Sequence, residues 1–250
     1  MTTSSTTGQP AGNLDWDSLT LAEGSHKNGE TDDCGNPLLC FMEAFNVSRG
    51  LRVTDGCPAY VSLTLHDFIV SFNDSLGTVD RQRLKPYRDR IAGTGGQPAV
   101  DERAAYMCVD WLIRTYTSAF LRLAGLDQHA DALASAGEVV DLATLGQVTD
   151  RIVAADSAAR SAAASAAASA AASAADSAAW SAAYWAAVSA AVSAADSAAY
   201  WAADSAAVSA AYSAADSAAA QDFAATVAAL QASAFGLLDR MIATYTIAAA

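Results

Sequence analysis

The chain has 250 residues, enough for one large domain or two small ones. Its 27 acidic residues outnumber 14 Lys and Arg, and the resulting net charge of −13 argues against nucleic acid and anionic membranes as partners. Four cysteines are too few for a disulfide-stapled secreted domain. The chain shows neither a signal peptide at its N-terminus nor a long apolar stretch free of Ala and Ser, so we expect a cytoplasmic protein without membrane contact.

The first 33 residues are rich in Ser, Thr and Gly, and a single Lys27 accompanies their acidic side chains. This composition is typical of a flexible acidic arm. The acidic residues are Asp15, Asp17, Glu23, Glu30, Asp32 and Asp33.

Residues 34–137 carry large apolar side chains at helical spacing, which predicts a small helical bundle. We expect helices around residues 38–45, 60–72, 79–91, 101–125 and 127–136, and Pro86 predicts a kink or break in the third of them. Asp101 and Glu102 open the fourth helix, where acidic residues suit the N-terminal dipole, and Gly125 ends it. Residues 60–69 are partly β-branched, so a strand is the alternative there.

Residues 138–221 lead into and contain a tetrapeptide, Ser-Ala-Ala-X, that recurs without a break over residues 157–220. Trp185 and Trp201 replace the Ser in two of the units. Ala is the best helix former and a poor strand former, so we predict a helical repeat segment rather than a silk-like sheet. A continuous helix from Gln147 to Phe235, a stretch without Gly or Pro, would be about 130 Å long at 1.5 Å per residue.

A period of four does not keep one face of a straight helix. Four residues advance an α-helix by about 400°, so each unit is displaced by about 40° from the previous one. Keeping the register would require a right-handed supercoil. The bulky side chains of the repeat would otherwise spiral around the helix and need a surface to pack on. These candidate interaction residues are Trp180, Tyr184, Trp185, Tyr200, Trp201 and Tyr212.

Residues 222–250 return to ordinary side-chain chemistry and predict an amphipathic C-terminal helix. This helix has an apolar face to bury against the helical domain or against another chain. The face comprises Phe223, Val227, Leu230, Leu237, Leu238, Met241 and Tyr245.

Several short segments resemble a family of uncharacterised actinobacterial and phage-borne proteins. They are residues 24–26 (GSH), 40–44 (CFMEA), 71–74 (SFND), 80–87 (DRQRLKPY), 110–114 (DWLIR), 123–126 (LAGL), 230–234 (LQASA) and 240–242 (RMI). The resemblance covers about residues 24–130 and 227–242. It implies that the two end segments belong to one folded unit and that an Ala-rich repeat of variable length is inserted between them. It implies no activity.

Candidate chemistry is sparse. His26, Cys34, Cys40 and Cys57 could supply metal ligands, although their spacing matches none of the usual zinc patterns, and ordinary thiols are the alternative. His26 with Glu30, Asp32, Asp33 or Glu43 could form an acid–base group. No catalytic motif stands out, and we expect no cofactor.

One basic cluster could bind phosphate or an acidic partner, including the acidic arm of the chain itself, or could be a solvated helix face. It comprises Arg81, Arg83, Lys85, Arg88 and Arg90.

The sequence therefore favours a non-enzymatic structural or interaction protein that uses the repeat as a spacer, scaffold or assembly surface. It would bind another protein or a second copy of itself, and oligomerisation is possible. An enzymatic or metal-dependent N-terminal domain is the main alternative. An ice-binding helix and an acidic protein of phage–host conflict are two others.

Overall fold

The computed structural model describes residues 14–27, 29–161 and 217–248. These residues form helices, turns and one isolated bridge between Thr31 and Pro37, without a strand among them. The predicted all-α class is therefore confirmed for this part of the chain. The repeat residues 162–216, with the six candidate aromatic residues, lie outside the described residues.

The N-terminal half contains α1 (Phe41–Ser48), α2 (Leu63–Ser75), α3 (Thr78–Arg81) and the 3₁₀ helix η1 (Gln82–Tyr87). The strand alternative for residues 60–69 is wrong, because the Ser62 hydroxyl accepts from the Leu65 backbone N–H and caps α2. The predicted third helix is two short pieces: the α-helix ends at Arg81, and the 3₁₀ turn that follows contains Pro86.

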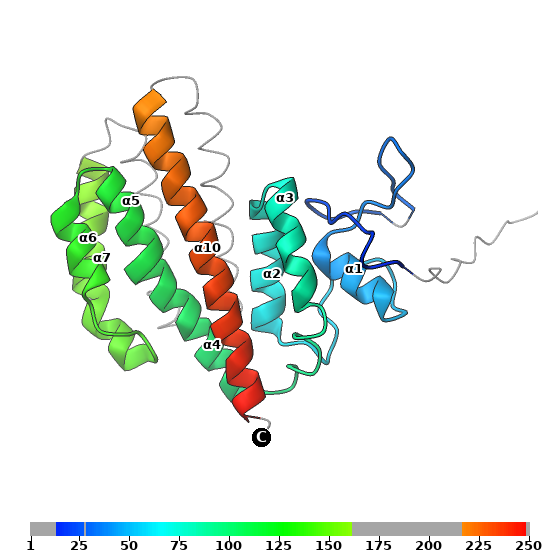
Figure 1. Cartoon of the computed structure of the whole chain (residues 1–250). Helices are drawn as coiled ribbons and strands as arrows, with labels where there is room; N and C mark the ends of the chain where they lie inside the picture. The colour runs from blue at the N-terminus through cyan, green and yellow to red at the C-terminus, as the bar shows by residue number, and fades with distance from the viewer. Residues whose placement is uncertain (1–13, 28, 162–216, 249–250) are drawn as a thin grey trace, which may run out of the picture.

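The centre of the chain forms one long rod. It consists of α4 (Pro98–Trp111), the π-helical segment η2 (Leu112–Thr117) and α5 (Ser118–Leu123). Pro98 occupies the first position of α4, where its missing N–H costs no helical bond. Gly125 follows the end of the rod with a φ of 72°, as predicted for a helix stop. Two further helices follow: α6 (Asp127–Ala134) packs against η2 and α5 of the rod, and α7 (Leu142–Ser161) packs against α6 (Figure 1).

The C-terminal helix α10 (Ser217–Ala248) crosses the molecule and packs against α2, α4 and α5 (Figure 1). Every residue of its predicted apolar face is buried. Phe235 meets Phe72 with ring centroids 4.8 Å apart, and Phe223 meets Phe120 at 5.7 Å. Of the two surfaces considered for this helix, the helical domain or another chain, the helical domain is the one that it contacts in this structure.

The boundary predicted after residue 33 is wrong. Three apolar residues of the expected acidic arm, Trp16, Leu19 and Leu21, are buried in the same core as α1 and α2. The Trp16 ring packs edge-on against Phe41, with centroids 5.7 Å apart. Apolar side chains among acidic ones are sufficient to anchor this segment, because each large buried side chain contributes about 1.5–3 kcal/mol.

The boundary predicted between residues 137 and 138 is also wrong. Leu145, Val148 and Ile152 of α7 are buried in the same core, and α7 packs against α6. Val148 and Phe235, near the two ends of the stretch without Gly or Pro, lie in the same core. The first repeat unit ends α7 and the last one begins α10, so these two units are helical as predicted.

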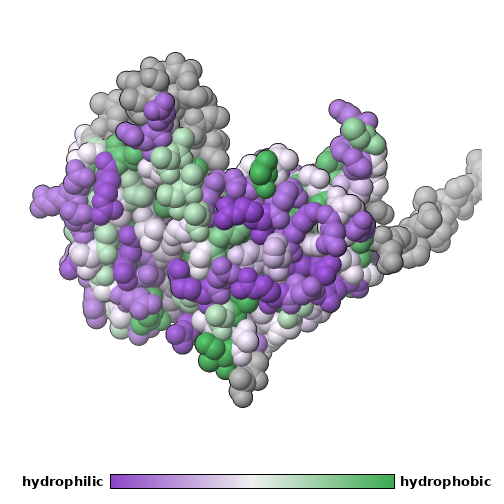
Figure 2. All heavy atoms as spheres, viewed as in Figure 1, coloured by the Kyte–Doolittle hydropathy of each residue, from purple (hydrophilic) through white to green (hydrophobic). Residues whose placement is uncertain are grey.

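Hydrophilic side chains cover much of the face seen in Figure 2, and hydrophobic ones show at the C-terminal end of α10. Ile247, near this end, is 76% exposed. Among the described residues, none of the helices combines the length and apolar character needed to span a bilayer.

Candidate functional site

The four candidate metal ligands do not converge. Within the described residues, no group of three or more His, Cys, Asp or Glu side chains could hold a metal ion. Cys34 is exposed in a turn, whereas Cys40 is buried and its sulfur accepts from the Glu43 backbone N–H at the start of α1. Burial raises the pKa of Cys40 to about 12 and that of Cys57 to about 11, so both stay protonated thiols at neutral pH.

Of the acidic residues considered as partners of His26, only Glu43 contacts it. The Glu43 carboxylate accepts from the His26 backbone N–H at 2.6 Å and lies 3.0 Å from its Nδ1. It also accepts from the Cys40 backbone N–H at 2.8 Å. Because Glu43 is buried and all these contacts are internal, the pair joins the loop that contains His26 to α1.

Residues of the basic cluster contact the N-terminal segment and α10. Lys85 donates to the Asp17 carbonyl, and the Arg81 guanidinium pairs with Glu23 at 3.2 Å, so the acidic N-terminal segment is indeed a partner. Arg90 pairs with Asp239 of α10 at 2.6 Å. The cluster thus links the N-terminal segment and α10 to the segment at residues 81–90.

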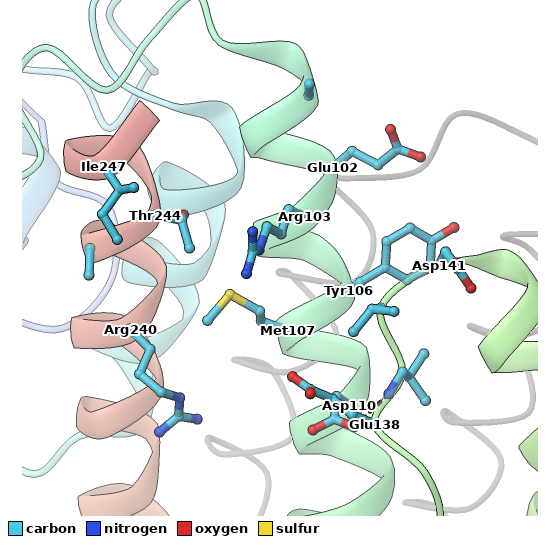
Figure 3. Close-up of a pocket in the computed structure, with 14 residues that line it drawn as sticks. Glu102, Arg103, Tyr106, Met107, Asp110, Glu138, Asp141, Arg240, Thr244 and Ile247 are labelled. Carbon is cyan, nitrogen blue, oxygen red and sulfur yellow. Dashed lines mark hydrogen bonds between the residues drawn. The ribbon is translucent and has the colours of Figure 1, made fainter. Parts of the chain in front are cut away.

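A trough of about 700 Å³ lies between α4, the last turns of α10 and the loop at residues 137–141 (Figure 3). Tyr106, Met107 and Asp110 form its floor, because positions three and four apart lie on one face of a helix. Arg240 and Thr244 come from α10, and Glu138 comes from the loop on the other side.

Charge is divided across the trough. Figure 3 shows the Arg103 and Arg240 side chains in the space between α4 and α10, whereas Glu138 and Asp141 come from the opposite wall. Within the part of the chain that the structure describes, neither of these guanidinium groups forms a hydrogen bond or an ion pair. Seven other arginines do form ion pairs, namely Arg49, Arg81, Arg83, Arg88, Arg90, Arg114 and Arg122.

Asp110 is a partly buried carboxylate on the floor of the trough. Burial raises the pKa of Asp110, although hydrogen bonds from the Val139 N–H at 2.9 Å and from Arg114 Nη1 at 3.3 Å oppose this effect. Its bond to Val139 fixes the loop wall against α4. A carboxylate with a raised pKa in a concave site is typical of a binding or catalytic position.

A buried polar network fixes the other wall. The Tyr245 hydroxyl of α10 donates to Asp101 Oδ1 of α4 at 2.6 Å and lies 2.7 Å from the Ser62 hydroxyl, which also donates to Asp101. Burial and the nearby carboxylate raise the pKa of Tyr245, so it remains a neutral donor. The network therefore holds α10 in place beside α4.

Sequence reasoning missed the trough. The helical spacing of Arg103, Tyr106, Met107 and Asp110 was a usable signal for one face of a helix, but no local pattern pairs this face with Arg240. His66 was missed too, because no motif surrounds it.

His66 makes stability depend on pH. Its Nδ1 lies 2.6 Å from Asp67 Oδ1 and its Nε2 donates to the Asp55 carbonyl, so both nitrogens face acceptors and the imidazolium form fits best. Burial alone would lower the pKa of His66, but these hydrogen bonds and the charges of Asp67 and Asp55 outweigh it and raise the pKa above 6.5. The stability that protonation contributes is complete below pH 6.5 and is lost as pH rises through the folded-state pKa.

We therefore expect the melting temperature to fall as pH rises above 6.5, and His66→Gln to reduce this fall. Thermal unfolding followed by circular dichroism from acidic to alkaline pH measures it. His129→Gln is the matched control, because within the described residues His129 has no side-chain partner. An equal fall in wild type and His66→Gln would contradict this role of His66.

Comparisons of the chain with models of protein families, with curated proteins and with solved structures found no match.

Proposed function

We propose that this chain is a cytoplasmic, non-enzymatic structural or interaction protein whose helical core carries the Ala-rich repeat as an assembly surface. Its partner would be a second copy of the chain or another protein. The observation that supports this proposal is the anchoring of both repeat ends in one core: the first unit is part of α7 and the last is part of α10.

The two anchors are built from ordinary apolar packing. Val148 and Ile152 of α7 are buried on one side, and Phe223 and Val227 of α10 are buried on the other. Helices α7, α6, α5 and α10 follow one another in contact, and the end of α7 lies at the same end of the molecule as the start of α10 (Figure 1). A straight helix would instead separate Ser161 from Ser217 by about 84 Å.

This arrangement suits an insertion whose length can change. Because the core is closed by α7 and α10, it does not need the chemistry of the units between them. The resemblance to proteins with an Ala-rich repeat of variable length supports the same organisation, and we propose that the chain belongs with them.

Excision of residues 162–216 tests the proposal. Replacing them with a short Gly/Ser linker should leave the core folded, with unfolding free energy changed by about 1 kcal/mol or less, because loop length affects closure entropy only weakly. The concentration-dependent association of the full chain should be lost. Thermal unfolding and sedimentation velocity measure the two effects.

A second variant keeps the repeat length and replaces only its aromatic residues with Ala. It should also lose association, because the aromatic side chains are the largest apolar groups of the repeat, whose other apolar residues are mainly Ala. An excised chain that unfolds would show that the repeat is part of the fold. A full chain that stays monomeric, or an excised chain that still associates, would contradict assembly through the repeat.

A further inference from the structure

The trough between α4 and α10 holds two cationic groups that lack internal partners. Arg103 and Arg240 come from different helices and enter the same space, with Met107 on the floor between them (Figure 3). In a chain with a net charge of −13, two unpaired arginines in one concave surface form a place where an anionic group is attracted. Two guanidinium groups also give the geometry that binds a carboxylate through several N–H donors.

The trough also contains carboxylates, which disfavour a ligand that carries only negative charge. Asp110 and Glu138 lie together at one end of it, and Glu102 and Asp141 also line it. These carboxylates would repel a polyanion such as a nucleic acid or a nucleotide triphosphate. They would attract an ammonium group placed on the far side of the ligand from its anionic end.

Part of the floor and part of the rim of the trough are apolar. Met107 is half-buried, and Val140 and Ile247 at the rim are 51% and 76% exposed. A ligand with a hydrocarbon part between its charged ends would cover these side chains and remove their apolar surface from water. The volume of about 700 Å³ accommodates a small molecule.

We infer that the trough binds a zwitterionic ligand of the amino-carboxylate class. Its carboxylate lies between Arg103 and Arg240 above Met107, its ammonium group faces Asp110 and Glu138, and its hydrocarbon part crosses the trough between these two ends. The proposed function through the repeat does not require this site, so either can fail alone.

Matched probes test the charge pattern. The full chain is titrated with ε-aminocaproate, with caproate, which lacks the ammonium group, and with hexylamine, which lacks the carboxylate. Shorter ω-amino acids, γ-aminobutyrate and β-alanine, report the preferred charge separation. The readout is the methyl resonance of Met107 in an NMR spectrum of methyl-labelled methionine, with the buried Met42 methyl as internal reference.

At least one zwitterion should shift the Met107 resonance, leave that of Met42 in place and bind about tenfold more tightly than either singly charged probe. Caproate or hexylamine binding as tightly as every zwitterion would overturn the inference, and so would the absence of any shift with all the probes.

Substitutions then assign the contacts. Arg103→Gln, Arg240→Gln and Glu138→Gln should each weaken zwitterion binding by about tenfold, because each removes one charge-assisted contact. Arg52→Gln is the charge-matched control: Arg52 is exposed, does not line the trough and should leave affinity unchanged. The three trough residues are exposed, so the variants should fold normally, which thermal unfolding checks. Equal weakening by Arg52→Gln would reduce the effect to net charge and overturn the site.

Discussion

Phe235→Ala is expected to lower the free energy of unfolding by about 3–5 kcal/mol, the range for truncating a buried aromatic side chain. Phe235 is 6% exposed and meets Phe72 of α2 at 4.8 Å and Tyr87 of η1 at 6.3 Å between ring centroids. The Arg83 guanidinium lies over the same ring, 4.1 Å from its centroid. One side chain thus joins α10 to two segments of the N-terminal half, and its loss leaves a cavity where they meet.

Urea unfolding followed by circular dichroism measures this effect. Ile247→Ala is the control on the same helix, because Ile247 is 76% exposed and its truncation should change stability by about 0.5 kcal/mol or less. If the two variants lost equal stability, α10 would not be held to α2 by its buried face. The difference in stability loss between Phe235→Ala and Ile247→Ala therefore tests whether the C-terminal helix belongs to the core.

The sequence predicted the helices wherever apolar side chains recur at helical spacing. The apolar face of α10 was assigned residue by residue and is buried as predicted. The π-helical segment in the middle of the long rod was not predicted, because no local pattern distinguishes Leu112–Thr117 from the α-helix on either side. It depends on tertiary packing, which propensity does not encode.

The N-terminal segment is more ordered than its sequence predicted. Its acidic and Ser-rich composition indicated a flexible arm, but composition averages over a few decisive side chains. Trp16 packs against Phe41, and the Arg88 guanidinium lies over the indole ring, 5.1 Å from its centroid. Both partners of Trp16 are distant from it in the sequence, so the residues around Trp16 do not reveal that it is buried.

The candidate site was unpredictable for the same reason. Arg103 looks like one charged residue on an exposed helix face, and Arg240 looks like another. Only the packing of α10 beside α4, fixed by the Tyr245–Asp101 hydrogen bond, brings them into one trough. Arg103 and Arg240 stand out because, among the residues that the structure describes, they lack internal partners, whereas seven other arginines form ion pairs, and only the structure shows this difference.

Glu43→Ala is expected to destabilise the chain by about 2–5 kcal/mol, because each buried donor left without an acceptor costs about 1–3 kcal/mol. The Glu43 side chain is 1% exposed and that of His26 is 10% exposed. The carboxylate accepts from the His26 backbone N–H, from the Cys40 backbone N–H and from the His26 ring. Its removal leaves two backbone donors and the His26 ring without an acceptor, and water cannot easily replace the carboxylate at a buried position.

Glu30→Ala provides the comparison within the same loop. The Glu30 carboxylate also accepts from a backbone N–H, that of Lys27 at 2.9 Å, but Glu30 is exposed and solvent can take its place. We expect this variant to lose about 1 kcal/mol or less. Glu43→Gln should fall between the two, because the amide keeps one acceptor oxygen but brings two donors to a site that already supplies donors. Urea unfolding of the three variants measures this order, and a Glu43→Ala chain as stable as Glu30→Ala would show that the His26 loop is not held by the buried carboxylate.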